Sequence, residues 1–184
     1  MQQTTIMTRD EIIHQPAITG SVRTLGPIDH QGLYDSLKTF IDRAQLGISQ
    51  QGLRWAGDFE GTSDLRYSDA NPKKITEQDF NRWIPGTEVL QQIAQSLNVR
   101  SVGRVRMLAM KPRSTYSLHH DPDAWRLHIP LITNPDAFMF VDGKMWHLPV
   151  GQAYLVKVQD HHLALNAGTE TRIHVVFDYC GNLA

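Results

Sequence analysis

Residues that can bind a metal ion are concentrated in one part of the sequence. Seven of the nine histidines lie between His119 and His174. His119 is followed two residues later by Asp121, and in an extended chain alternate side chains point to the same side. His119 and Asp121 can therefore bind one cation while His120 points away. This segment predicts half of a metal site.

A third ligand is available from a histidine doublet about forty residues further along the chain, His161 and His162. Two imidazoles and one carboxylate, with coordination positions left open, suit non-haem Fe(II) in oxygenases. A single His-x-Asp pair is more often a hydrogen-bonded turn without a metal. The clustering of histidines favours the metal site, but the spacing alone does not choose between His161 and His162.

The composition indicates one folded domain with a small-molecule partner. A chain of 184 residues is long enough for one hydrophobic core, and its 41% hydrophobic and 20% charged residues are typical of a soluble globular protein. The 18 basic and 19 acidic residues give a formal charge of -1. This charge offers no bulk attraction to nucleic acid or to an anionic membrane, so we expect neither as a partner.

The single cysteine, Cys180, has no partner for an internal disulfide. The first residues have neither a charged start nor an apolar run, and no segment approaches the roughly 20 apolar residues of a membrane-spanning helix. We therefore expect a cytoplasmic protein. The sequence does not indicate its oligomeric state.

The N-terminal half, residues 1–98, is expected to contain strands, loops and three supporting helices. Asp29 caps the first helix, which ends before Gly47; Thr76 begins a short helix that Pro85 ends; and Thr87 caps the third. Apolar residues at helical spacing would pack these helices against a sheet. In the three segments these residues are Leu33, Leu37, Phe40, Ile41 and Ala44; Phe80, Trp83 and Ile84; and Val89, Leu90, Ile93, Ala94 and Leu97.

From Val99 onward the hydrophobic period changes to two, which predicts at least six short strands. Asp142-Gly143 between two apolar runs predicts a hairpin turn. Many short strands favour a closed antiparallel barrel of the jelly-roll or cupin kind. We therefore predict a single mainly β domain, with flanking helices and with residues 99–184 as the barrel core.

Two predicted strands have polar faces that would point into this barrel. Burying an unpaired arginine costs several kcal/mol, so an inward Arg126 or Arg172 implies an anion. That anion is either a ligand or a protein carboxylate such as Asp123 or Asp178. The residues on these faces are Arg126, His128 and Pro130 in one strand and Arg172, His174, Val176 and Asp178 in the last.

The combined pattern resembles the aspartyl/asparaginyl beta-hydroxylase family of Fe(II)- and 2-oxoglutarate-dependent dioxygenases, which is related to bacterial proline hydroxylases. The resemblance covers residues 100–180, and its most specific feature is an arginine ten residues after the distal histidine. The matching residues are His119-x-Asp121, Arg126-x-His128-x-Pro130-Leu131, Gly151, His162-x-x-x-Asn166 and Arg172.

The resemblance implies a double-stranded β-helix that holds Fe(II) through His119, Asp121 and His162. It also implies that 2-oxoglutarate and dioxygen take the remaining coordination positions. Arg172 matches the residue that anchors the far carboxylate of 2-oxoglutarate through a bidentate salt bridge. His128 would support a carboxylate of the same co-substrate.

The implied reaction hydroxylates an unactivated C–H bond of an amino acid or of a peptide residue resembling Asp, Asn or Pro, and it releases succinate and CO2. Arg126 is the candidate partner of a substrate carboxylate, and Trp125, Trp146 and Tyr116 are candidates for the wall of the substrate site.

Two other interpretations of the function stay open. One is a metal-binding cupin enzyme that does not use 2-oxoglutarate, and the other is a non-catalytic barrel that binds an acidic small molecule.

Overall fold

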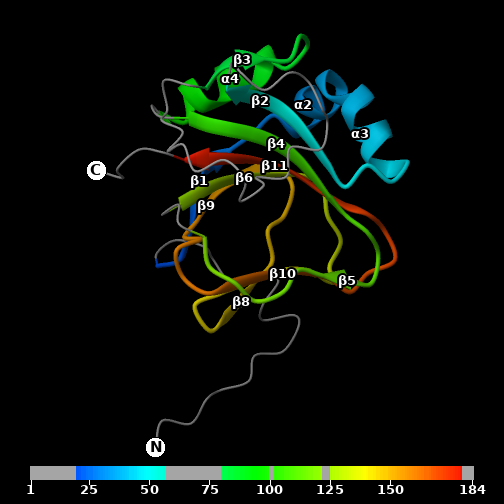
Figure 1. Cartoon of the computed structure of the whole chain (residues 1–184), viewed down its shortest axis with the longest axis vertical. Coiled ribbons are helices and arrows are strands. Elements are labelled where there is room, and N and C mark those ends of the chain that lie inside the picture. The colour runs from blue at the N-terminus through cyan, green and yellow to red at the C-terminus, as the bar shows by residue number, and fades with distance from the viewer. Residues whose placement is uncertain (1–19, 57–79, 100–101, 122–124, 180–184) are drawn as a thin grey trace, which may run out of the picture.

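In the computed structural model, two antiparallel β-sheets face each other, and helices cover the outer side of the larger sheet (Figure 1). The structure describes residues 20–56, 80–99, 102–121 and 125–179. Among these residues, no helix is long and apolar enough to cross a membrane. The predicted fold class, a mainly β jelly-roll or cupin-like barrel with flanking helices, is confirmed.

The larger sheet has seven strands in the order β1-β9-β6-β11-β4-β2-β3, and the smaller sheet has four in the order β5-β10-β7-β8. The strands of the larger sheet are β1 Val22–Pro27, β2 Gln50–Ala56, β3 Phe80–Trp83, β4 Val102–Met110, β6 Trp125–Ile132, β9 Gln152–Val156 and β11 Arg172–Tyr179. Those of the smaller sheet are β5 Ser114–Thr115, β7 Ala137–Val141, β8 Lys144–Trp146 and β10 His162–Asn166. Strands far apart in sequence, β6 and β11, are therefore central neighbours.

The described helices are α2 His30–Ser36, α3 Lys38–Gln45 and α4 Glu88–Ser96. The predicted N-cap is confirmed, because Asp29 accepts a hydrogen bond from the backbone of Gly32 at 3.0 Å. The single helix expected after Asp29 is in fact two, because the backbone leaves helical geometry at Leu37, where φ is -103°. Gly47, with φ at 110°, lies just beyond α3 as expected.

One of the predicted helices is wrong. Phe80–Trp83, expected to be helical, forms β3 and pairs with β2. Thr76, the expected first residue of this helix, lies outside the described residues. Aromatic residues are favoured in strands. A short helix ending at Pro85 would leave most of its backbone N–H and C=O groups without hydrogen bonds, whereas pairing with β2 provides partners for them.

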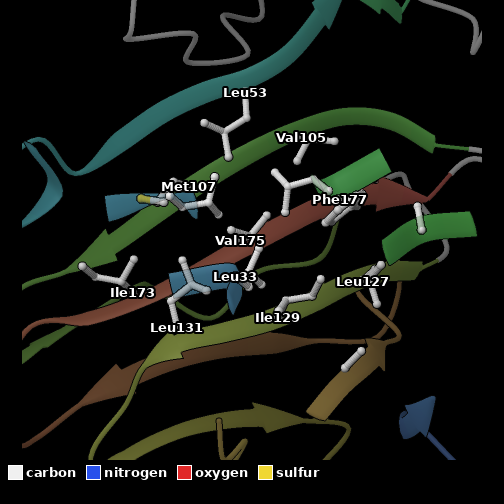
Figure 2. Close-up of a cluster of buried hydrophobic side chains, with 14 of the residues drawn as sticks. Leu33, Leu53, Val105, Met107, Leu127, Ile129, Leu131, Ile173, Val175 and Phe177 are labelled. Carbon is white, nitrogen blue, oxygen red and sulfur yellow. The ribbon is translucent and has the colours of Figure 1, made fainter. Parts of the chain in front are cut away.

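The apolar faces of the central strands pack against the helices (Figure 2). Leu127 and Ile129 of β6 lie beside Val175 and Phe177 of β11, and all four are almost completely buried. Each such side chain contributes roughly 1.5–3 kcal/mol on burial. Because side chains alternate in a strand, this packing turns the polar faces of β6 and β11 toward the smaller sheet.

The smaller sheet is held by the predicted hairpin. Asp142 and Gly143 connect β7 to β8 with φ angles of 49° and 77°. Both angles lie in the left-handed region that a type I′ turn needs, and Asp-Gly supplies it at low cost. The other edge of β7 pairs with β10, whose first residue is His162.

Candidate metal centre

His119 and His162 lie opposite each other at the start of β10. Their backbones form an antiparallel bridge, and their imidazole centroids are 4.4 Å apart. His120 and His161 form a second pair on the other side of the same strands, with centroids 5.5 Å apart, and both are exposed. The structure therefore brings His162, not His161, next to His119.

Asp121 completes a cluster of three side chains, whose nearest nitrogen and oxygen atoms all lie within 4.8 Å of one another. Asp121 Oδ2 is 3.8 Å from His119 Nε2 and 3.4 Å from His162 Nε2. The Asp121 backbone donates to the carbonyl of Val158 at 2.9 Å, which holds the segment at this position. The three ligands expected from the sequence are thus assembled in space.

The two histidines are oriented by hydrogen bonds from their other nitrogens. His119 Nδ1 donates to the carbonyl of Ser117 at 2.7 Å, and His162 Nδ1 donates to that of Asp160 at 3.0 Å. A carbonyl can only accept, so in the neutral rings the proton is on Nδ1 and the lone pair is on Nε2.

In the neutral rings two Nε2 lone pairs and the Asp121 carboxylate then face one another, and they repel unless a proton or a metal ion lies between them. This two-histidine, one-carboxylate set, with tautomers fixed by backbone carbonyls, fits a divalent transition metal such as Fe(II).

Arg126 links the metal centre to the interior of the larger sheet. Its Nη1 lies 2.6 Å from Asp121 Oδ2, and its Nε lies 3.1 Å from Asp178 Oδ1. Burial alone would raise the pKa of Asp121, but the His162 ring and the Arg126 guanidinium together lower it to about 2. Asp121 is therefore ionised at any pH near neutrality, as a metal ligand must be.

Asp178 is the centre of a buried cluster of charges. Arg104 Nε donates to its Oδ2 at 2.9 Å, and Arg106 Nη2 donates to its Oδ1 at 3.0 Å. Burial opposes ionisation, but the charges of Arg106, Arg104 and Arg126 hold the pKa of Asp178 below its ordinary value. Arg126 thus pairs with a protein carboxylate, Asp178, which was one of the two partners expected from the sequence. The contact of Arg126 with a substrate carboxylate stays a prediction.

Arg172 lies deeper in the barrel with two neutral histidines. Its Nη2 donates to His174 Nδ1 at 3.1 Å, so the proton of His174 is on Nε2. The His174 and His128 rings meet edge to face at 5.8 Å. Burial, aided by the charge of Arg172, lowers the pKa of both histidines well below the ordinary value. Burial also lowers the pKa of Arg172 to about 10. This pKa is still well above 7, so Arg172 stays charged near neutral pH.

This region contains buried polar atoms without partners. Three ring nitrogens have no hydrogen-bond partner within the described parts of the chain. They are Nδ1 and Nε2 of His128 and Nε2 of His174. Leaving buried polar atoms unpaired costs roughly 1–3 kcal/mol each, so such atoms usually mark the place of a polar ligand or of water. Beside the charged Arg172, the chemistry fits an anion.

The three predicted aromatic wall residues have different positions. Trp125 packs against the helix-side core, with Arg23 4.9 Å above its ring. This corrects its assignment to the wall, because strand alternation turns it away from Arg126. Trp146 is buried between the sheets, and its Nε1 has no partner among the described residues. Tyr116 is exposed and close enough to Arg172 to influence its pKa.

Comparison with known families agrees with this geometry. Residues 69–181, more than half of the chain, match the family described as aspartyl/asparaginyl beta-hydroxylase. The chain belongs to this family. As a member of the aspartyl/asparaginyl beta-hydroxylase family it is a hydroxylase-type oxygenase. Among curated proteins, none matches the chain.

Two solved structures share the fold over nearly the whole chain. AviO1 from Streptomyces viridochromogenes Tue57 is 16% identical with a TM-score of 0.56, covering 98% of each chain. An oxidoreductase of the 2OG-Fe(II) oxygenase family from Burkholderia pseudomallei is 10% identical with a TM-score of 0.54, covering 90% of this chain and 92% of its own.

A third match, the plu4264 protein from Photorhabdus luminescens, has a TM-score of 0.36 and 15% identity. This chain spans 59% of that protein's length, and the match covers 40% of this chain.

Arg104, Arg106 and His174 received no role from the sequence, and Asp178 was expected only as a candidate partner of Arg126 or Arg172. His174 orients Arg172, and Asp178 joins Arg104 and Arg106 to Arg126. Their positions in the sequence could have indicated these roles, because each of the four is polar and lies in a strand whose other face is apolar. Such residues point inward, and buried charges must find partners.

Proposed function

We propose that the chain is an Fe(II)- and 2-oxoglutarate-dependent dioxygenase that hydroxylates an unactivated C–H bond of a free amino acid or of a peptide residue, with release of succinate and CO2. Membership of the aspartyl/asparaginyl beta-hydroxylase family supports this proposal. The observation that carries the 2-oxoglutarate part is the buried Arg172, which lies beside imidazole nitrogens that have no hydrogen-bond partner among the described residues.

In this proposal His119, Asp121 and His162 would hold the iron. The two imidazoles are preoriented by their bonds to Ser117 and Asp160, so little freedom is lost on binding. Bound Fe(II), with 2-oxoglutarate and dioxygen, supplies an oxidising power that no protein side chain has.

Arg172 binds the far carboxylate of 2-oxoglutarate. The planar guanidinium matches a carboxylate in a bidentate pair, and the charge-assisted bonds are stronger in a buried environment. His174 Nε2 donates to the same carboxylate, since its Nδ1 accepts from Arg172. His128 is neutral and buried, so it adds a hydrogen bond without adding charge. The burial of all three residues excludes water from this end of the site.

The substrate approaches the metal near Arg126, with Tyr116 and Trp146 as remaining candidates for its surroundings. Arg126 Nε and Nη1 are engaged with Asp178 and Asp121, so a substrate carboxylate would share the guanidinium with these two residues. We infer a small amino acid or a peptide segment as the partner, because the near-zero formal charge gives no attraction to nucleic acid.

An anaerobic titration tests the proposal. Fe(II) is added to the protein first and 2-oxoglutarate second, and the visible spectrum is recorded. Bidentate binding of the keto acid to iron produces a weak charge-transfer band, which we expect in the native protein and not in Arg172→Ala at the same concentrations. Iron binding without the band would favour a cupin enzyme that does not use 2-oxoglutarate. Binding of an acidic small molecule without any metal would favour a non-catalytic barrel.

A screen for the substrate follows in air. Succinate release is measured over free amino acids and short peptides with Fe(II) and 2-oxoglutarate present. We expect release above the uncoupled background for at least one class, and mass spectrometry should show a gain of one oxygen atom in that substrate. No stimulation by any of them would count against an amino acid or peptide substrate.

A further inference from the structure

A continuous chain of contacts runs from the middle of the larger sheet to the candidate metal centre. Arg126 and Asp178 are directly opposite each other in the pairing of β6 with β11. Nε of Arg126 lies 3.1 Å from Asp178 Oδ1, and its Nη1 lies 2.6 Å from Asp121 Oδ2. One guanidinium therefore joins a buried carboxylate to the carboxylate of the metal centre.

We propose that Asp178 is a positioning residue for the metal centre. It fixes the guanidinium of Arg126, and through it the carboxylate of Asp121, in the orientation that faces the two imidazoles. This inference rests on the proposed function, since it assigns to Asp121 the role of a ligand. It extends the site by one buried residue that does not touch the metal.

The rigidity of the guanidinium makes this transmission possible. Its nitrogens lie in one plane, so an ion pair that holds the Nε edge of the guanidinium also restricts the direction in which Nη1 points. A free arginine side chain has four rotatable bonds and would not hold Asp121 in one place. Asp178 is only 7% exposed, so water does little to weaken its ion pair with Arg126.

The Asp178 carboxylate is itself held from a third strand. Arg104 and Arg106 of β4 bond to its two oxygens. Because β11 lies between β4 and β6, a carboxylate at this position reaches arginines on both neighbouring strands. Asp178 is therefore fixed before any metal or substrate binds, which is the property that a positioning residue needs.

The experiment measures Co(II) binding to the full chain in the absence of other ligands. Co(II) is stable in air, and its visible absorption reports the number and geometry of its ligands. We expect Asp178→Asn to weaken Co(II) binding roughly 10- to 100-fold, as loss of a partner behind a metal ligand usually does. Its spectrum should also change, because Asp121 is no longer held.

Arg104→Lys is the matched control. It disturbs the same buried cluster at the other oxygen of Asp178, but it keeps a positive charge for that oxygen and leaves both Asp178 and Arg126 in place. We expect a comparable loss of thermal stability and an unchanged Co(II) affinity and spectrum. Equal weakening by Arg104→Lys would mean that any damage to the cluster has the same effect, and it would overturn the inference.

A double-mutant cycle identifies the route of the effect. In an Asp121→Ala background the ligand is already missing, so Asp178→Asn should weaken Co(II) binding no further. If the weakening is the same with and without Asp121, Asp178 acts on general structure and the inference is wrong.

Arg126→Lys keeps the cluster charge and provides a second variant if Asp178→Asn does not fold. A lysine cannot bridge both carboxylates, so Arg126→Lys should weaken Co(II) binding to a similar extent, and only when Asp121 is present. Unchanged affinity in Arg126→Lys would overturn the inference. Failure of the native chain to bind Co(II) would overturn the proposed function itself.

Discussion

The backbones of His119 and His162 are joined by two reciprocal hydrogen bonds. His119 N donates to His162 O at 3.0 Å, and His162 N donates to His119 O at 2.8 Å. This pairing puts both side chains on one face and puts their neighbours His120 and His161 on the other. The two doublets therefore supply two candidate ligands and two matched controls at adjacent positions.

We expect His119→Ala and His162→Ala to abolish Fe(II)-dependent succinate release, because each removes one of three ligands. His120→Ala and His161→Ala should retain it, because their rings point to solvent. Fe(II) affinity measured anaerobically, with circular dichroism as a check on folding, separates loss of metal from loss of structure. An inactive His161→Ala beside an active His162→Ala would show that the distal ligand is His161.

Arg172 should control affinity for 2-oxoglutarate and not affinity for iron. A charge-assisted hydrogen bond is worth about 1.5–3 kcal/mol, so Arg172→Ala should weaken 2-oxoglutarate binding at least roughly 10- to 100-fold. Arg172→Lys should be intermediate, since a point charge does not replace the planar fork. Separate titrations with Fe(II) and 2-oxoglutarate check this. Unchanged 2-oxoglutarate affinity in Arg172→Ala would remove the main support for a 2-oxoglutarate enzyme.

The stability of the ligand-free protein should fall as the pH drops from about 6.5 to 5. The pKa values of His128 and His174 are well below the ordinary value because both rings are buried beside Arg172. In this range the unfolded chain binds protons that the folded chain does not, so the free energy of unfolding increases with pH. Each histidine contributes up to about 1.4 kcal/mol per pH unit.

Urea unfolding at several pH values measures this slope. His174→Asn should reduce it relative to the native chain, because one depressed group is lost, whereas the exposed His120→Asn should leave it unchanged. A slope in His174→Asn equal to that of the native chain would contradict the prediction.

Asn166 should be intolerant of an isosteric change. It is completely buried, and its Nδ2 donates to the carbonyls of Met110, Lys111 and Glu170 at 2.8–3.1 Å. Asn166→Asp would direct a carboxylate oxygen at three acceptors, so we expect the free energy of unfolding to fall by about 3 kcal/mol or more. Asn134 is partly exposed and donates a hydrogen bond to Asn166 Oδ1, so Asn134→Asp should lower the free energy of unfolding by less. Denaturant titrations of the two variants make the comparison.

Much of the fold could be predicted because its signals are local. The cap at Asp29, the turn at Asp142-Gly143 and the two faces of β6 and β11 depend on residues within a few positions of one another. The segment Phe80–Trp83 was misassigned because a short aromatic run fits either a helix or a strand. Its pairing with β2, which the sequence does not reveal, decides in favour of the strand.

The sequence by itself determined the chemistry of the site. The spacing of His119 and Asp121, the second histidine doublet and an inward-facing arginine followed from residue types and from strand alternation. Only the tertiary structure decided that His162 is the histidine next to His119, because a shift of one residue in strand register exchanges the two faces. It alone joined Asp178 to Arg126, since that contact depends on the pairing of two strands that are distant in sequence.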